Sequence, residues 1–164
     1  MVGSPLWQPT GGQRAGAVQL DGADDYVRTT FVMNASAGPF SVFAWVKGGA
    51  PGQTALSQVG GVNWFMVAPH GGLATELRQA GRLGKPLTST AIIDDGAWHH
   101  VGLVWDGANR TLYVDDIEVA KDAQSSLAAS GGGLYIGAGS TLAPGTFWSG
   151  LIDDVRIYNR AVKP

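Results

Sequence analysis

The sequence contains no cysteine among its 164 residues. Disulfide bonds and thiolate metal sites are therefore excluded, although this absence fits an exported bacterial protein as well as a cytosolic one. Charge is also scarce, because only 15% of the residues are charged and the 11 lysines and arginines are scattered singly. Nucleic-acid binding needs clustered cations that release phosphate counterions, so we expect no nucleic-acid partner.

Long apolar runs are missing too. No run approaches the roughly 18 residues that a membrane span needs, so we expect no membrane insertion. Residues 1–12 lack a cationic stretch followed by an apolar one, which predicts that this chain carries no signal peptide. Both ends of the sequence read as if cut from something longer, and we expect residues 1–164 to form one domain of a larger protein.

The residues that are abundant indicate an all-β chain. Hydrophobic residues make up 45% of the sequence, and 25 glycines punctuate it. No stretch longer than about 10 residues keeps apolar side chains at helical spacing, whereas short runs rich in Val, Ile, Phe, Trp and Tyr recur between turn signals. Strands are predicted at 17–20, 26–29, 40–47, 55–59, 64–68, 74–79, 88–93, 99–105, 111–114, 118–121, 134–136 and 150–158. A dozen strands in one domain predict a two-sheet antiparallel β-sandwich, and the strand at 40–47, apolar on both faces, should be central.

Five pieces of sequence, in order, carry a resemblance to a known family. They are residues 17–27, 40–47, 96–101, 105–107 with 112–116, and 150–161. This set resembles the bacterial laminin-G-like (concanavalin A-like lectin/glucanase) domain family over residues 17–162. The resemblance implies a jelly roll of two antiparallel sheets, carried by secreted or surface bacterial proteins that bind carbohydrate or protein partners and often hold calcium. Asp116 departs from the glycine common in the family, so the Asp115–Asp116 turn is expected to be strained or differently shaped.

Enzymatic activity is not expected. Sandwich glycosidases use paired carboxylates, mostly glutamates, close together on one strand. This chain has only Glu76 and Glu118, far apart in sequence. Adjacent aspartates point to opposite faces of a strand, and so do His99 and His100, which we expect to be structural. A carbohydrate-binding module is therefore the leading hypothesis, a protein-protein adhesion or spacer module is the alternative, and a glycan hydrolase or lyase is the least favoured.

Calcium is the metal that the carboxylates favour, since it takes oxygen ligands supplied by loops. The turn at residues 21–25 offers three carboxylates beside a glycine, and Asp21 and Asp24 are predicted ligands. The resemblance implies that Asp153 is the first ligand, because related glucanases use the matching aspartate and the terminal strands meet in one sheet. The alternative is that Asp21-Gly22 is a plain β-turn and that Asp153 or Asp154 pairs with Arg156 or Arg28.

Six tryptophans could offer faces for sugar rings. Trp45, Trp98 and Trp105 are predicted to lie in the core. Trp64 and Trp148 follow loop-like stretches, where binding residues collect, and are predicted to line a ligand groove on the concave sheet or at loop tips. Hydrogen bonds to sugar hydroxyls would come from three polar neighbours, Asn63, Glu76 and Arg78. The alternative is that these tryptophans only pack.

Overall fold

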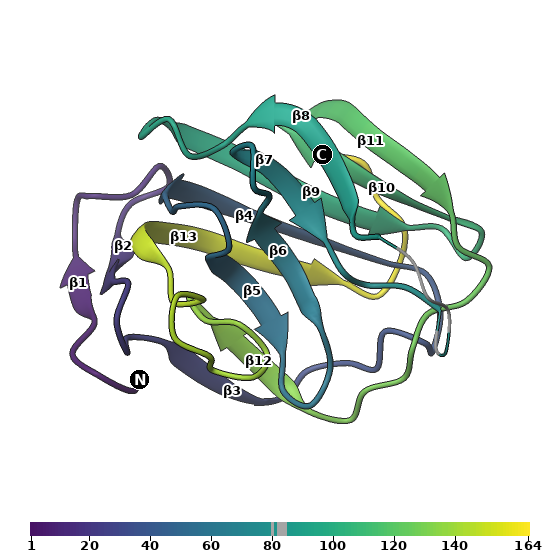
Figure 1. The fold of residues 1–164 in the computed structure, drawn as a ribbon, viewed down its shortest axis with the longest axis horizontal. Coiled ribbons are helices and arrows are strands. Elements are labelled where there is room, and N and C mark those ends of the chain that lie inside the picture. Colours follow the sequence, from purple (N-terminus) through teal and green to yellow (C-terminus); the bar gives the residue numbers. More distant parts are fainter. Residues whose placement is uncertain (80, 82–84) are drawn as a thin grey trace.

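A computed structural model describes residues 1–79, 81 and 85–164. Figure 1 shows two layers of strands joined by turns and loops. The strands are β1 (Leu6–Gln8), β2 (Ala17–Asp21), β3 (Val27–Phe31), β4 (Phe40–Gly48), β5 (Thr54–Gln58), β6 (Asn63–Val67), β7 (Gly72–Thr75), β8 (Leu87–Ile92), β9 (Trp98–Trp105), β10 (Asn109–Val114), β11 (Ile117–Ala123), β12 (Gly133–Ile136) and β13 (Ser149–Tyr158). Among the described residues, no helix is long and apolar enough to cross a membrane.

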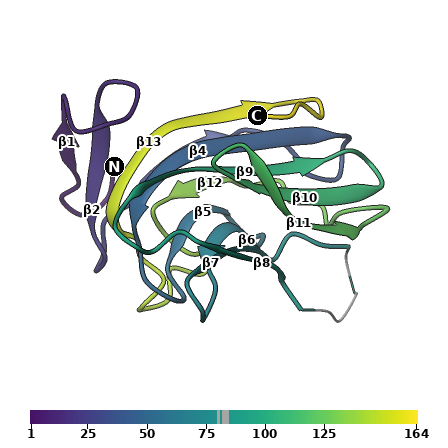
Figure 2. The same ribbon diagram turned by 90° about the horizontal axis from the view of Figure 1, so that it is seen from above.

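Each sheet is antiparallel. One has seven strands in the order β1-β2-β13-β4-β9-β10-β11, and the other has six in the order β3-β12-β5-β6-β7-β8. The seven-stranded sheet curves over the six-stranded one, and β2 near the start of the chain pairs with β13 near its end (Figure 2). This architecture confirms the predicted all-β, two-sheet antiparallel sandwich of the jelly-roll type.

The sequence pattern of β4 explains how the sandwich is built. Phe40, Val42, Ala44 and Val46 alternate along the strand and are buried between the sheets. The intervening residues, Ser41, Phe43, Trp45 and Lys47, fall on the outer face, since successive side chains of a strand point to opposite faces. Because β4 lies between β13 and β9, the prediction that it is a central strand is confirmed.

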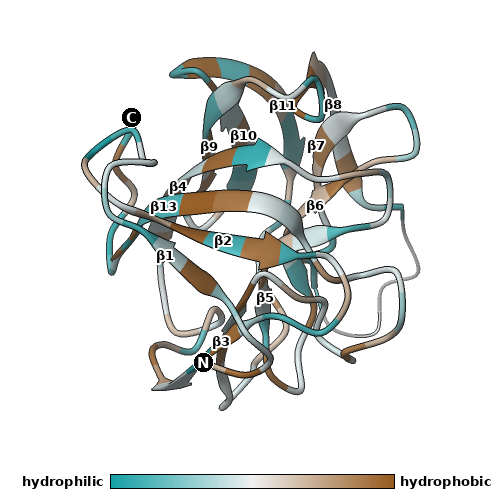
Figure 3. Cartoon of the chain, turned by 90° about the vertical axis from the view of Figure 1, so that its left-hand side faces the viewer, coloured by the Kyte–Doolittle hydropathy of each residue, from teal (hydrophilic) through white to brown (hydrophobic). Residues whose placement is uncertain are grey.

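Hydrophobic and hydrophilic residues also mix along other strands of the same sheet. Figure 3 shows hydrophobic and hydrophilic segments along both β2 and β13 on the side that carries β1. The outer face of the seven-stranded sheet is therefore not uniformly polar, and aromatic side chains of β4, β9 and β13 gather on it. This face carries the site described below.

The predicted strands differ from the structure most clearly in two places. β1 was not predicted, because three residues are too few to display an alternating pattern; Leu6 and Trp7 on it are 59% and 60% exposed. The strand predicted at 74–79 is β7, which begins at Gly72 and ends at Thr75. Leu77 lies beyond the end of β7 and is buried in the core. Its apolar side chain was therefore mistaken for part of the strand.

Candidate functional site

An aromatic groove of about 380 Å³ lies on the outer face of the seven-stranded sheet. We call it the aromatic groove throughout. Its lining contains four ring side chains, Phe43, Trp45, His100 and Tyr158. Its charged lining consists of Arg14, Asp116, Arg156 and Lys163, and Val162 and Pro164 complete it. The groove thus combines apolar ring faces with a few polar groups, which is the composition typical of ligand sites.

The floor of the groove is a stack of rings across two strands. Trp45 on β4 stands opposite His100 on β9. Their ring centroids are 5.0 Å apart with an interplanar angle of 25°, and the His100 ring also stacks on Phe43 at 5.6 Å and 28°. Directly opposed residues of antiparallel strands are the closest side-chain pairs in a sheet, so the register itself creates the stack.

Gly102 makes room for this floor. It stands opposite Phe43 in the β4–β9 pairing. A Cβ atom at position 102 would lie 2.7 Å from Cδ1 and Cε1 of the Phe43 ring. The glycine therefore lets the phenylalanine ring lie flat across β9, where a larger residue would push it outward.

A bulge in β13 forms one wall. The pairing of β13 with β4 shifts register between Asp153 and Arg156, and Asp154 has a φ of 50°. Arg156 is paired with Asp154: its Nε donates a hydrogen bond to Oδ1 at 2.9 Å, and its Nη2 lies 2.8 Å from Oδ2 in an ion pair. The bond to Asp154, followed by one to Tyr158, raises the pKa of the Arg156 guanidinium above its usual range. The bulge thus aims a fixed cation at the groove.

The loop before β2 forms a second wall. The backbone N–H of Arg14 donates to Oδ2 of Asp153 at 2.9 Å, across 139 residues of sequence. Gly12 of the same loop also lies against this carboxylate, since an added Cβ would come within 2.6 Å of Oδ2. Asp153 therefore holds the loop that places Arg14 at the groove.

The segment after β13 forms the third wall. Ser41 on β4 fixes it, because its hydroxyl accepts the Val162 N–H at 2.8 Å and lies 2.9 Å from the carbonyl oxygen of Arg160. The Arg160 guanidinium lies 5.9 Å from the centre of the Tyr158 ring. The outer residues of β4 thus contribute both to the floor and to the wall above it.

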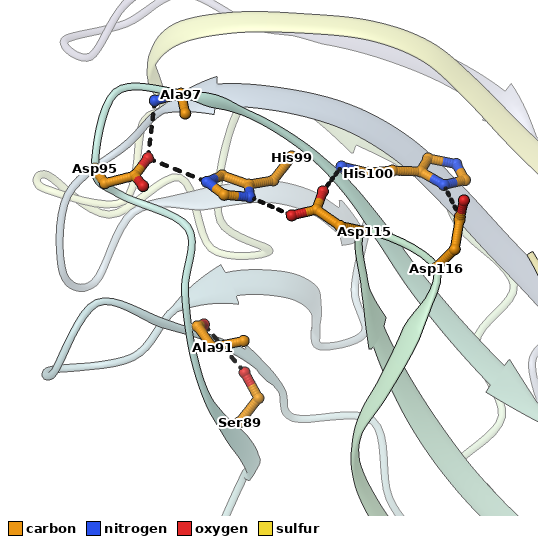
Figure 4. A network of polar contacts seen from close by, with 8 residues as sticks. All are labelled: Ser89, Ala91, Asp95, Ala97, His99, His100, Asp115 and Asp116. Atoms are coloured by element: carbon orange, nitrogen blue, oxygen red, sulfur yellow. Dashed lines mark hydrogen bonds and ion pairs between the residues drawn. The ribbon is translucent and has the colours of Figure 1, made fainter.

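A histidine–aspartate network supports the groove from one end (Figure 4). The Nδ1 atom of His99 lies 2.9 Å from Asp115 Oδ2, and its Nε2 atom lies 3.1 Å from Asp95 Oδ1. Both ring nitrogens can donate only when the imidazole is protonated. Burial lowers the pKa of His99, but the hydrogen bonds that its ring makes to Asp115 and Asp95 outweigh burial and raise the pKa above its usual value of 6.5. In its protonated form, His99 therefore ties the turn before β9 to the β10–β11 turn.

The β10–β11 turn is unusual because two aspartates occupy it. Asp115 and Asp116 have φ values of 52° and 67°, positive at both central positions as a type I′ hairpin turn requires. The turn therefore keeps an ordinary hairpin conformation, and the expected strain amounts to a non-glycine residue, Asp116, in a conformation that favours glycine. Asp115 Oδ1 accepts the backbone N–H of His100, and Asp116 Oδ1 lies 2.6 Å from His100 Nδ1. These contacts, visible in Figure 4, offset the backbone strain and orient the His100 ring.

The tryptophans predicted to line a groove lie elsewhere. Trp64 and Trp148 are both 0% exposed. Trp64 packs on Phe40 with ring centroids 5.5 Å apart, and Trp148 lies against Gly49. A fully buried indole offers no face to a sugar, so the prediction is corrected: Trp64 on β6 and Trp148, the residue before β13, both belong to the hydrophobic core. Conversely, Trp45, predicted to be core, is only half-buried and lies in the groove.

Two of the three predicted polar residues come together. Glu76 accepts the Asn63 N–H at 3.3 Å, and its own N–H donates to the Asn63 carbonyl at 3.0 Å. The Asn63 side-chain oxygen accepts the Ser140 N–H. Arg78 is half-buried two residues beyond Glu76, and its carbonyl accepts the Ala128 N–H. A role in ligand binding for these residues stays a prediction.

The predicted metal ligands are brought together only in part. Asp21 and Asp24 form a cluster with Asp25, in which one oxygen of each lies within 4.8 Å of the others. Asp153 is not part of it: Asp21 stands opposite Ser149, and Asp153 is four residues further along β13, about 13 Å away at the usual strand rise. The terminal strands do meet, as the resemblance implied, but the register separates Asp153 from the turn.

Hydrogen bonds within the turn occupy part of this acidic cluster. Asp21 Oδ1 accepts the N–H groups of Ala23 and Asp24, and the first of these lowers the pKa of the Asp21 carboxyl. Asp25 is buried and accepts the N–H groups of Ser4 and Asp21. The alternative that residues 21–25 form a hydrogen-bonded turn therefore agrees with the structure. The alternative that Asp154 pairs with Arg156 does so too.

Sequence reasoning missed the aromatic groove because its walls come from distant segments. Alternation put Phe43 and Trp45 together on one face of residues 40–47, but both faces are apolar, so the pattern did not show which face is the outer one. No pattern within one strand, however, announces that Arg14 and Arg156 reach the same place. The signal that could have been used is the outward pair on β4 next to the outward His100 on β9.

Comparisons with known proteins agree with the fold. None of the curated proteins matches the chain. Among solved structures, the binding domain of Paraclostridial Mosquitocidal Protein 1 has a TM-score of 0.76 at 10% identity, over 97% of this chain and 43% of that one. Domain 4 of AbnA, a GH43 extracellular arabinanase from Geobacillus stearothermophilus solved with arabinotriose, has a TM-score of 0.67 at 19% identity, over 99% of this chain and 78% of that one.

A third similar structure is the ligand-binding domain of Botulinum neurotoxin serotype D in complex with N-acetylneuraminic acid, with a TM-score of 0.67 at 13% identity, over 90% of this chain and 39% of that one. This chain therefore spans less than half the length of both toxin domains. Such low identities carry the fold and no more. A sequence model, in contrast, matches residues 21–164. The chain belongs to the concanavalin A-like lectin/glucanases superfamily.

Proposed function

We propose that the chain is a non-catalytic carbohydrate-binding module of a secreted or surface bacterial protein, with its sugar site in the aromatic groove. One observation carries this proposal: the half-buried Trp45 ring lies in a groove beside Tyr158, with charged groups at the rim. Aromatic rings present a large apolar face at little entropic cost, while the rim supplies hydrogen bonds to hydroxyls.

The carboxylates near the groove support a binding role over a catalytic one. Glycoside hydrolysis requires two carboxyl groups about 5 to 9.5 Å apart across the scissile bond. Among the described residues that line the groove, Asp116 is the one with a carboxylate side chain, and it is bonded to His100. Glu76 lies in the other sheet layer, bonded to Asn63.

The similar structures support the same class of function. Domain 4 of the arabinanase was solved with arabinotriose, and the serotype D toxin domain with N-acetylneuraminic acid. Their common fold can thus present sugars in different proteins. The arabinanase is extracellular, which also fits the secreted location that we propose.

A glycan array tests the proposal directly. The wild-type chain should bind at least one glycan class, and Trp45→Ala should lose it. Phe31→Ala is the matched control, because Phe31 is 59% exposed on β3 of the six-stranded sheet and its loss should leave binding intact. If Trp45→Ala unfolds, Tyr158→Ala provides the same test from β13. Binding that is absent, or insensitive to both groove variants, contradicts the proposal.

Calcium is a second part of the proposal, as a structural ion at the turn of residues 21–25. The clustered oxygens of Asp21, Asp24 and Asp25 support it, since calcium takes several carboxylate oxygens. A bound ion must stabilise the folded state by mass action. Calcium should therefore raise the melting temperature of the wild type over that in chelator, and Asp24→Asn should abolish the difference. Equal melting temperatures with calcium and with chelator contradict the proposal.

Protein-protein adhesion remains the second candidate function, and β1 favours it. This strand is at the edge of the seven-stranded sheet, with Leu6 and Trp7 mostly exposed. An edge strand with apolar side chains can pair with another chain. A clean glycan array, together with a partner whose capture is lost in Trp7→Ala, would favour this function over sugar binding.

A further inference from the structure

We propose that the aromatic groove selects sugars that carry a carboxylate, such as uronic or sialic acids; this inference rests on the proposed function. The charge of the groove differs from that of the chain. The whole chain has a net charge of −2, whereas the lining holds three cations, Arg14, Arg156 and Lys163, against one carboxylate side chain, Asp116. The cations therefore outnumber the acidic side chain in the groove that holds the Trp45 and Tyr158 rings.

The acids at and beside the groove all have partners. Asp116 contacts His100 Nδ1 at 2.6 Å. Asp153 accepts the backbone N–H of Arg14, and Asp154 accepts a hydrogen bond from Arg156 and forms an ion pair with it. Each carboxylate thus has an internal donor, which reduces its repulsion of an incoming anion.

Arg156 is oriented for a planar anion. Its Nε and one N–H of Nη2 face Asp154, and the contact with Tyr158 fixes it further. A guanidinium has five N–H donors in a rigid fork, so donors remain for a ligand carboxylate. The side chain is 52% exposed, which leaves those donors accessible.

Arg14 supplies a cation without an internal partner. Within the part of the chain that the structure describes, its guanidinium makes no ion pair or hydrogen bond. Its backbone is nevertheless fixed by Asp153, so the exposed side chain starts from a defined place at the groove wall. A free cation at a fixed position has little to lose on binding an anion.

The rings and the cations together define the ligand. A pyranose can lie against Trp45 while its carboxylate reaches the wall formed by Arg14 and Arg156. Ion pairs between exposed charges each contribute up to about fivefold in affinity at low salt. A carboxylated sugar that contacts both arginines should therefore bind several-fold more tightly than its neutral counterpart.

The test measures affinity by calorimetry at low salt for two pairs of probes. Trigalacturonic acid is compared with neutral galactotriose, and 3′-sialyllactose with lactose. At least one carboxylated probe should bind more tightly than its neutral counterpart, and which one does so separates uronic from sialic acids. Added salt should weaken the preference, because exposed charges are screened.

Variants locate the preference. Arg14→Gln and Arg156→Gln should each remove most of it, and Arg14→Glu should weaken carboxylated probes further while leaving neutral ones unchanged. Arg28→Gln is the matched control, because Arg28 is an exposed arginine on β3 of the other sheet. Arg14→Gln also avoids the Asp154 contact, so it stays informative if Arg156→Gln perturbs folding.

The outcomes distinguish this inference from the function beneath it. Equal affinity for charged and neutral probes, still lost in Trp45→Ala, overturns the carboxylate preference and leaves the groove as a sugar site. A preference that Arg28→Gln removes and Arg14→Gln does not also overturns it. Binding of every probe that is insensitive to Trp45→Ala overturns the proposed function itself.

Discussion

The two faces of β4 use aromatic rings in opposite ways. On the inner face, Phe40 packs on Trp64 with ring centroids 5.5 Å apart, and both side chains are completely buried. On the outer face, Trp45 stacks on His100 at 5.0 Å but stays half-buried in a groove. The comparison teaches that the ring type alone does not mark a binding residue. What separates the two tryptophans is the direction of the side chain: Trp64 on β6 points into the core between the sheets, whereas Trp45 on β4 points away from it.

The largest expected effect is on the inner face. Trp64→Ala should lower the free energy of unfolding by about 3 to 5 kcal/mol, because it leaves a cavity beside Phe40. Trp45→Ala should cost much less, since its ring is only half-buried. Urea unfolding of both variants measures the difference. If Trp45→Ala were the more destabilising of the two, the assignment of structural and binding roles to the two faces would be wrong.

The next effect concerns the space under the Phe43 ring. Gly102→Ala should destabilise the fold by about 1 to 3 kcal/mol, because the new methyl group would lie 2.7 Å from the ring and force it outward. The displaced ring should also weaken glycan binding. Gly38→Ala is the control, since a Cβ there meets no atom within 4 Å. Equal stability of the two variants would show that the groove floor is not tightly packed.

These comparisons also show how far sequence carries. Alternation in residues 40–47 was enough to predict the central strand, but both faces are apolar, so it did not show which side chains leave the core, and Trp45 was wrongly predicted to lie in the core. It could not place Trp64, because a short apolar run facing the other sheet looks the same as a strand with an exposed aromatic. It also could not show that Asp153 lies far from Asp21. Their distance depends on the register between β2 and β13, which the sequence of either strand alone does not determine.

A third effect is the pH dependence of the support beneath the groove. The pKa of His99 is raised above 6.5 in the fold, so the stability that it contributes is fully present below pH about 6.5 and is lost as the pH rises through the raised value. The melting temperature of the wild type should therefore fall as the pH rises above about 6.5. His99→Gln should be less stable than the wild type at pH 6, because it loses the two contacts with Asp115 and Asp95, and should show a flatter profile.

The pKa of Asp95 is lowered chiefly by the Ala97 N–H and then by His99, so its contribution has the opposite sign. That contribution is present above pH about 3.8 and is lost as the pH falls through the lowered value. The network should thus stabilise the fold most between pH about 3.8 and pH about 6.5. Parallel profiles for the wild type and His99→Gln across pH 6 to 9 would contradict a protonated His99 between two carboxylates.

The smallest expected effect is on the other sheet, where Asn63 and Glu76 satisfy each other. Glu76→Gln keeps the size of the side chain and an oxygen for the Asn63 N–H. If sugars bind in the aromatic groove, its affinity for any glycan that the wild type binds should stay within about twofold, as for a site that makes no ligand contact. Calorimetry beside Trp45→Ala measures this. A large loss in Glu76→Gln with an unchanged melting temperature would move the site to the six-stranded sheet, because it would show that the charge of Glu76 serves a ligand rather than the fold.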